Sequence, residues 1–455
     1  MTASIKKKSE MDLTNGSIIK KLTVYSIPFI FANILQILFN TADIMILGIF
    51  VGDEAVGAVG ANSSLSGLLV NLFVAFSIGA NVVLARYVGE RNLEGARKTV
   101  GTAILLAVIA GFILLAIGVP LAPQFLLLMG CDPAILDLAT VYLRIYFLGM
   151  PIMMLYNFCA SILRAVGDTK RPLIFLAIGG TVNVILNVFF VVVLKMTVEG
   201  VAIATIVSQA ISATLSIRVL LKSDGYGCLK MKYLRISKEQ LSKISAIGIP
   251  SALQSLAFNI SNVLIQSKVN SFGVNGTAGN TAAQQFDAVI YNIGNAIAMS
   301  GMAFVSQNFG AKNFDRIKKI IPTTVLLVFV FQFGVGSIFA LLSPWLVSFI
   351  VSGEQAILFA STRLTIMGFS YFLCGTMETF ANTVRALGKP IVSLIISVFG
   401  SAVFRVAFLE LVFPFFPYFS TIFITYIASW SVTVATYLIV VPNLFKKIKN
   451  NVLEG

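Results

Sequence analysis

The chain has 455 residues, of which 57% are hydrophobic and 11% charged, with a formal net charge of +14. A soluble chain usually carries about 25% charged residues, so this composition excludes a conventional soluble fold and requires apolar surface that faces lipid. The sequence contains no histidine, which excludes histidine proton relays and histidine-ligated zinc or haem. The cysteines Cys131, Cys159, Cys228 and Cys374 form no C-x-x-C pair, so neither a disulfide framework nor a zinc site is expected.

Twelve apolar runs along the chain are long enough to cross about 30 Å of hydrocarbon, which takes about 20 helical residues. Glycine and proline interrupt several runs, as membrane bundles tolerate. The first run follows a polar segment and is too long for a signal peptide, so we expect it to be retained. The sequence therefore predicts an all-α polytopic membrane protein with spans at 22–51, 57–85, 99–120, 138–163, 173–194, 199–221, 240–267, 281–306, 320–343, 355–384, 390–411 and 417–441.

The basic residues lie almost entirely on one side of this predicted bundle. With the N-terminus inside, the inner segments and the inner ends of the adjoining spans hold 28 of the 33 lysines and arginines, and the outer loops hold only Lys195 and Lys268. The positive-inside rule then predicts cytoplasmic termini and a multi-pass protein of the cell (inner) membrane. The charge serves orientation and contact with membrane lipids, so no nucleic-acid partner is expected.

The two halves resemble each other at an offset of about 221 residues. Identical or similar residues recur in the same order in both halves. The matching segments are Ile27-Pro28 with Ile249-Pro250, VGERNLEGARK at 88–98 with FGAKNFDRIKK at 309–319, and RAVG at 164–167 with RALG at 385–388. Because each half has six spans, the two repeats run parallel, related by an axis along the membrane normal.

This repeat predicts an N-lobe at 22–221 and a C-lobe at 240–441. A linker at 222–239 and end segments at 1–21 and 442–455 are predicted to be cytoplasmic. Parallel repeats are common in secondary transporters, which bind substrate between lobes that rock. The alternative is duplication without a role in transport. The prolines Pro28, Pro151 and Pro250, which lie within spans, are candidate hinges.

One carboxylate lies deep in the first span. Asp43 has no basic residue within a helical turn, and intramembrane carboxylates are costly, so it is a candidate functional residue. Asn183 and Asn187 share one face of the fifth span. At 1.5 Å per residue Asn187 and Thr205 come to a depth similar to that of Asp43. We predict a cation-coupling site of these four residues; packing bonds between helices are the alternative.

In the C-terminal half, Glu378 and Arg405 lie within the tenth and eleventh spans and are candidates for the substrate path, and Asp287 is a weaker one. Their depths differ, so a direct pair of Glu378 with Arg405 is left open, as are structural roles for both. Arg363 lies near an outer end, where we expect it to snorkel. In the fourth span, Met150 and Met154 could line an adaptable apolar pocket.

These motifs resemble the multidrug and toxic compound extrusion (MATE) family, in its DinF-like branch, over nearly the whole chain. Each motif is weak by itself, but their order and their duplication are specific. The motifs are the Pro28 helix with Ala42-Asp43, RAVGDTKRP at 164–172, TVNVILN at 181–187, AIAT at 202–205 and RALGKP at 385–390.

The resemblance implies export of amphipathic, often cationic compounds, driven by inward H⁺ or Na⁺. In that branch the cation site uses an aspartate on the first helix, an asparagine and an aspartate four apart on the fifth, and a threonine on the sixth. These map onto Asp43, Asn183, Asn187 and Thr205, and Asn187 departs from the pattern. With one carboxylate, a Na⁺ at Asp43 would be poorly neutralised, so H⁺ is favoured over Na⁺.

Two other functions remain open. A flippase or exporter of a lipid-linked or amphipathic metabolite would share the fold, and fold alone does not separate it from a drug exporter. A membrane-embedded enzyme would need a nucleophile with a base, or metal ligands, and the sequence offers neither, so no enzyme is expected. We expect a monomer without a cofactor, with H⁺ or Na⁺ as coupling ion and small amphipathic substrates.

Overall fold

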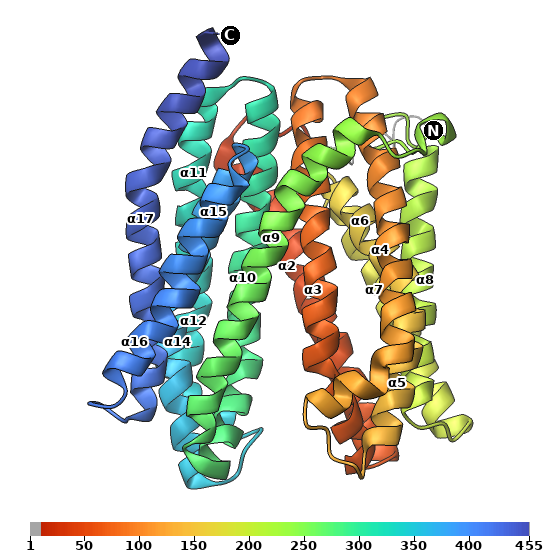
Figure 1. Ribbon diagram of the computed structural model, residues 1–455, viewed down its shortest axis with the longest axis vertical. Coiled ribbons are helices and arrows are strands. Elements are labelled where there is room, and N and C mark those ends of the chain that lie inside the picture. Colours follow the sequence, from red (N-terminus) through yellow and green to blue (C-terminus); the bar gives the residue numbers. More distant parts are fainter. Residues whose placement is uncertain (1–10, 455) are drawn as a thin grey trace. The chain divides into compact units, whose positions relative to one another are not determined.

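The computed structural model describes residues 11–454, except for the side chains of 63–66, 68–73 and 453–454. Every regular element within these residues is helical (Figure 1). The helices are α2 (Ile18–Phe50), α3 (Asp53–Gly89), α4 (Leu93–Leu128), α5 (Leu136–Leu148), α6 (Met150–Ala165), α7 (Lys170–Val188), α8 (Val198–Lys222), α9 (Lys238–Asn270), α10 (Gly273–Gly310), α11 (Phe314–Val328), α12 (Gly334–Leu341), α13 (Ser343–Val347), α14 (Glu354–Ala386), α15 (Pro390–Ser397), α16 (Phe404–Val412) and α17 (Phe419–Glu454).

The predicted spans are confirmed as helices. Among the described residues, ten helical stretches are long and apolar enough to cross a membrane, and α5 with α6, bent by 51°, supply an eleventh. The 37 residues of α3 cover the predicted span 57–85 and complete the twelve. Three spans contain a π-helical turn, at Phe189–Val193 after α7, Phe329–Phe333 between α11 and α12, and Val398–Val403 between α15 and α16.

Proline marks the break between α5 and α6. Pro151 lies in the first turn of α6, directly after the break that bends α5 against α6, because proline has no N–H to continue the hydrogen bonds of the preceding helix. A Cβ added at Gly111 of α4 would lie 2.3 Å from the Cα of Pro151, so the two backbones touch. Pro28 and Pro250 lie inside the unbroken helices α2 and α9. A hinge role for the three prolines stays a prediction.

Packing within the chain divides it into two compact units. Unit 1 contains Phe31–Ala252, and unit 2 contains Leu13–Ile30 together with residues 253–454. The units therefore differ from the predicted lobes at two places, the start of α2 and the start of α9. In both helices the change of unit falls two residues after the repeated proline, Pro28 or Pro250.

Side-chain contacts explain why these helix ends join the units they do. In unit 2, the ring of Tyr25 on α2 lies edge-on to Phe304 of α10, with centroids 5.6 Å apart. In unit 1, Gln240 at the start of α9 accepts a hydrogen bond from the Thr99 hydroxyl (3.0 Å) and donates one to the Tyr87 hydroxyl (3.1 Å). Each helix start is thus fixed by buried, long-range partners.

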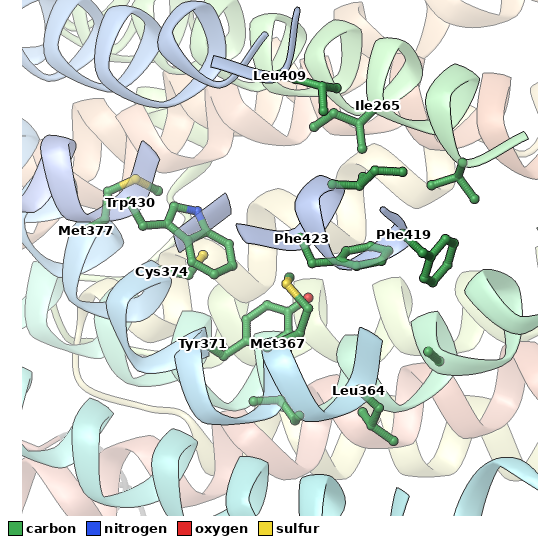
Figure 2. Close-up of a cluster of buried hydrophobic side chains, with 14 of the residues drawn as sticks. Ile265, Leu364, Met367, Tyr371, Cys374, Met377, Leu409, Phe419, Phe423 and Trp430 are labelled. Carbon is green, nitrogen blue, oxygen red and sulfur yellow. The ribbon is translucent and has the colours of Figure 1, made fainter. Parts of the chain in front are cut away.

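The interior of unit 2 contains a continuous apolar cluster that joins α9, α10, α14, α16 and α17. Figure 2 shows Trp430 beside Met377 and Cys374, and Ile265 next to Leu409. These side chains are at most 6% exposed. Burial of large apolar side chains at close packing fixes how these helices are arranged inside unit 2.

Candidate functional site

The four residues predicted as a coupling site come together in unit 1. The Asn187 amide nitrogen donates to Asp43 Oδ1 (2.5 Å) and to Asn183 Oδ1 (3.2 Å). The Asn183 amide nitrogen donates to the Thr205 hydroxyl oxygen (3.4 Å). That hydroxyl lies 3.4 Å from Asp43 Oδ2 and 3.0 Å from the Val201 carbonyl, either of which can accept its proton. One cluster therefore joins α2, α7 and α8.

Two glycines of α7 bring the helices close enough for these contacts. A Cβ on Gly180 would lie 1.8 Å from the ring of Phe39 on α2, and a Cβ on Gly179 would lie 2.2 Å from the Ser212 hydroxyl on α8. The absent side chains let α2 and α8 both pack on α7 one turn before Asn183. Our sequence reasoning missed these glycines, although the pair Gly179-Gly180 just ahead of the asparagines is a visible signal.

The cluster offers oxygen atoms and no cation of its own. Among the described residues no lysine or arginine forms an ion pair with Asp43, which is half-buried. Asn187 is fully buried and its Oδ1 has no hydrogen-bond partner. Carboxylate, amide and hydroxyl oxygens are the ligands that a hard cation prefers. The carboxylate can also bind a proton. No group of three or more Cys, Asp or Glu that could hold a metal ion occurs among the described side chains.

The predicted residues of the C-terminal half do not form one site. Asp287 Oδ2 accepts a hydrogen bond from Arg363 Nε at 2.7 Å, and Oδ1 of the Asn280 side chain accepts another from Arg363 Nη1. Both charges are buried, at 3% and 7% exposure. The prediction that Arg363 snorkels is wrong, because its partner on α10 holds it inside unit 2. Asp287 belongs to this ion pair.

Glu378 and Arg405 have separate surroundings. Glu378, on α14, is half-buried, and no described residue forms an ion pair with it. Arg405, on α16, is 4% exposed and contacts aromatic and neutral polar side chains. In unit 1, Met150 and Met154 are fully buried, so here they pack the interior of the unit. Roles for these residues in a substrate path stay predictions.

Twelve helical spans in two parallel repeats define an integral membrane protein with the fold of a transporter. The MatE family model matches residues 28–189 and 250–409, once in each half, and the chain belongs to this family. The double match is an independent confirmation of the internal repeat.

Related sequences and a solved structure support the same family and fold. The chain is 26% identical over 392 residues to the probable multidrug resistance protein YoeA of Bacillus subtilis, covering 84% of each. It is 24% identical over 396 residues to the FAD transporter of Shewanella oneidensis, covering 86% of this chain and 87% of the relative. A multidrug resistance MATE family transporter solved in an outward-facing conformation has a similar fold, with a TM-score of 0.89 and 22% identity over 96% of this chain and 98% of that one.

Proposed function

We propose that the chain is a secondary antiporter that exports amphipathic, often cationic compounds, driven by inward movement of H⁺ through Asp43. The observation that carries the proposal is the setting of Asp43, a carboxylate inside an apolar helix that is held by an amide and a hydroxyl and lacks a basic partner among the described residues. Such residues in membrane proteins act in ion and proton pathways. Relatives named as multidrug resistance proteins support the substrate class.

The neighbours of Asp43 suit a carboxyl group that alternates between two protonation states. The ionised carboxylate accepts the hydrogen bond from the Asn187 amide nitrogen. When Asp43 is protonated its carboxyl becomes a donor, and the unpartnered Asn187 Oδ1 can accept that proton once the amide turns over. Loading from outside would neutralise Asp43 and favour one arrangement of α2 on α7, and release inside would restore the other.

Na⁺ is the competing coupling ion. The oxygens of Asp43, Asn183, Asn187 and Thr205 could all bind it, but only one of these groups carries charge. A hard cation favours charged oxygen ligands, whereas a proton needs only one basic oxygen and one acceptor. This difference favours H⁺.

Transport by purified protein in vesicles tests the proposal. Rhodamine 6G, an amphipathic cation, is followed under an imposed proton gradient, an imposed sodium gradient and neither. We expect proton-driven export by the wild-type chain and none by Asp43→Asn, which mimics the loaded state permanently. Asp53→Asn makes the same chemical change at an exposed position of α3 and should export at the wild-type rate.

Two results would overturn the coupling scheme. Proton-driven export by Asp43→Asn at the wild-type rate would remove Asp43 from the mechanism. Export that follows only the sodium gradient would reverse the choice of ion while keeping the site.

Export or flipping of an amphipathic metabolite is the second candidate function. The relative named as an FAD transporter supports it, since FAD is an aromatic metabolite that carries phosphates. We further propose that the chain lies in the inner membrane with both termini in the cytoplasm, acts as a monomer and needs no cofactor. The 28 to 2 distribution of basic residues supports the orientation.

A further inference from the structure

Arg405 is a buried charge without a compensating charge. Its Nε donates to the Ser429 hydroxyl (3.1 Å) and its Nη1 to Asn262 Oδ1 (3.4 Å). Its guanidinium carbon lies 4.2 Å from the centre of the Tyr426 ring and 5.9 Å from that of Trp430. No carboxylate among the described residues forms an ion pair with it.

This cluster occupies the place in unit 2 that the Asp43 cluster occupies in unit 1. The offset between repeats is 222 at the prolines of α2 and α9. It falls to 218 in α15 and α16, because RAVGDTKRP is three residues longer than RALGKP, and it returns to 221 in α17. Corresponding residues are Asn40 with Asn262, Asp43 with Ile265, Asn187 with Arg405, Thr205 with Tyr426, and Ser208 with Ser429.

Two contacts confirm this correspondence in three dimensions. The Ser208 hydroxyl donates to the Thr205 carbonyl at 2.8 Å, and the Ser429 hydroxyl donates to the Tyr426 carbonyl at 2.9 Å. The same bond therefore occurs at the same place of α8 and α17. Ile265, the counterpart of Asp43, lies within the apolar cluster (Figure 2). The two repeats thus place opposite charges in corresponding clusters, at different positions within each cluster.

A purely structural role does not account for Arg405. Its neighbour in unit 2, Arg363, shows the structural solution, since Asp287 neutralises it at 2.7 Å. A guanidinium buried without such a partner carries a desolvation cost that neutral oxygens and aromatic rings offset only in part. Buried charges that lack protein partners are typical of binding sites in membrane proteins.

The hydrogen-bonding groups around Arg405 point to the chemistry of the missing partner. Asn262 Oδ1 accepts from Arg405 and also from the Tyr426 hydroxyl (3.3 Å), which leaves the Asn262 amide nitrogen as a donor. Arg405 Nη2 and this nitrogen have no acceptor among the described residues. Asn262 is exposed and Tyr426 half-exposed, so a ligand can reach them. Two donors beside an aromatic ring suit a planar or tetrahedral oxyanion.

We propose that Arg405, with Asn262 and Tyr426, binds the carboxylate or phosphate of an aromatic, amphipathic compound. The inference rests on the proposed function in treating the chain as a transporter, and it adds anionic and zwitterionic compounds to the proposed substrate class. Trp430, which is 3% exposed, contacts the guanidinium on its buried side through the face of its ring.

Flavin mononucleotide and riboflavin provide a matched pair of probes, because they share a fluorescent aromatic ring and differ in the phosphate. Binding of each to the purified full-length chain in phosphatidylcholine vesicles is measured by flavin fluorescence polarisation, without any gradient. Gradient-driven dye export is not involved, so failure of the coupling scheme at Asp43 would leave this measurement unaffected. We expect flavin mononucleotide to bind at least about tenfold more tightly, as charge-assisted hydrogen bonds to the phosphate imply.

Variants assign this preference to the site. With Arg405→Gln, flavin mononucleotide and riboflavin should bind equally tightly. Arg405→Lys should retain part of the preference for flavin mononucleotide, because the charge remains while the planar guanidinium is lost. Asn262→Ala, at an exposed position, should weaken the preference with little risk to folding. Lys268→Gln removes a positive charge elsewhere in unit 2, from a pair with Glu410, and should leave the preference unchanged. Size-exclusion profiles and melting temperatures verify that each variant is folded.

Anionic lipid is the other source of an accessible phosphate. Mass spectrometry of phosphatidylglycerol retained by wild type and by Arg405→Gln separates the two sources. Retention that depends on Arg405, without a flavin preference, would assign the oxyanion site to a lipid headgroup. Equal binding of both flavins to the wild type with no lipid difference would overturn the proposal, as would a flavin preference that survives in folded Arg405→Gln and Asn262→Ala.

Discussion

At the scale of single residues, buried charges in this chain are stabilised in three different ways. Asp43 is held by an amide and a hydroxyl, Arg363 by a carboxylate, and Arg405 by aromatic rings and neutral oxygens. Of these three, only Arg363 has a counter-charge among the described residues. Removing its charge should therefore harm stability, whereas changes at the other two should alter function first.

The ion pair of Arg363 with Asp287 gives a prediction about stability. Arg363→Gln leaves Asp287 buried without a counter-charge, which typically costs about 3–5 kcal/mol. We expect a strongly lowered melting temperature, measured by fluorescence-detected size exclusion in detergent. Lys268→Gln breaks a pair at 3.0 Å whose members are part-exposed, and such pairs contribute about 0–1 kcal/mol. Equal melting temperatures for the two variants would contradict a structural role for the buried pair.

A second prediction concerns the asparagine beside Asp43. Asn187→Asp places a second carboxylate 2.5 Å from the first at the present amide position. Two adjacent negative charges bind a hard cation better than one, so rhodamine 6G export should become more dependent on an imposed sodium gradient. Asn40→Asp, at an exposed position one turn before Asp43, should not do so. Loss of all export without any gain in sodium dependence would argue against a shared cation position.

What could be predicted about single residues depended on helix spacing and estimated depth. Asn183 and Asn187 share a helix face by spacing alone, and depth in the membrane placed Asp43 and Thr205 beside them. Spacing and depth did not identify the partner of Arg363, because Asp287, 76 residues earlier in the chain, reaches it through the packing of α10 against α14. The sequence analysis likewise did not pair Arg405 with Asn262, which the packing of α9 against α16 brings together.

At the scale of helices, the coupling cluster depends on how closely α2 packs against α7. Gly180→Ala places a Cβ 1.8 Å from the Phe39 ring, so the ring and α2 must move away. We expect slowed proton-driven export with the chain still folded. Gly334→Ala, at a helical glycine with no atom within 4 Å, should instead stabilise the protein by about 0.5–1 kcal/mol.

A rescue variant makes this prediction specific. Phe39→Ala removes the ring that the new Cβ would meet, so Gly180→Ala with Phe39→Ala should export faster than Gly180→Ala alone. If the double variant is as slow as the single one, close approach of α2 to α7 does not limit transport.

Hydropathy predicted where helices exist but not how their backbones run. Transfer of apolar side chains into lipid depends on composition, so the spans were visible as apolar runs. The π-helical turns at Phe189–Val193 and Val398–Val403 leave no such trace, because a wider turn buries the same side chains. The bend at Pro151 is an exception, since proline removes a backbone donor that can be read from the sequence.

At the scale of the whole molecule, the two halves share one repeated arrangement of helices and differ in the residues of their polar clusters. The repeat, the twelve spans and the charge bias followed from sequence. The exchange of the starts of α2 and α9 between units did not, because it depends on long-range contacts such as Tyr25 with Phe304. Recognising that Arg405 lies in the counterpart of the Asp43 cluster also required the correct alignment of α16 with the first repeat. The offset between the repeats is three residues smaller there, because RALGKP is three residues shorter than RAVGDTKRP.

The last prediction tests the orientation of the whole chain with a native reporter. Cys131 follows α4 in a segment predicted to lie outside and is part-exposed, whereas Cys159, Cys228 and Cys374 are buried. A membrane-impermeant maleimide added to intact spheroplasts should therefore label the wild-type chain, and Cys131→Ser should lose the label. In that background, cysteines at Gly227 and Lys449 should be labelled only after the membrane is opened, because the basic residues around them are retained on the cytoplasmic side. Labelling of either position in sealed spheroplasts would reverse the assigned orientation, and with it the direction in which Asp43 would carry protons.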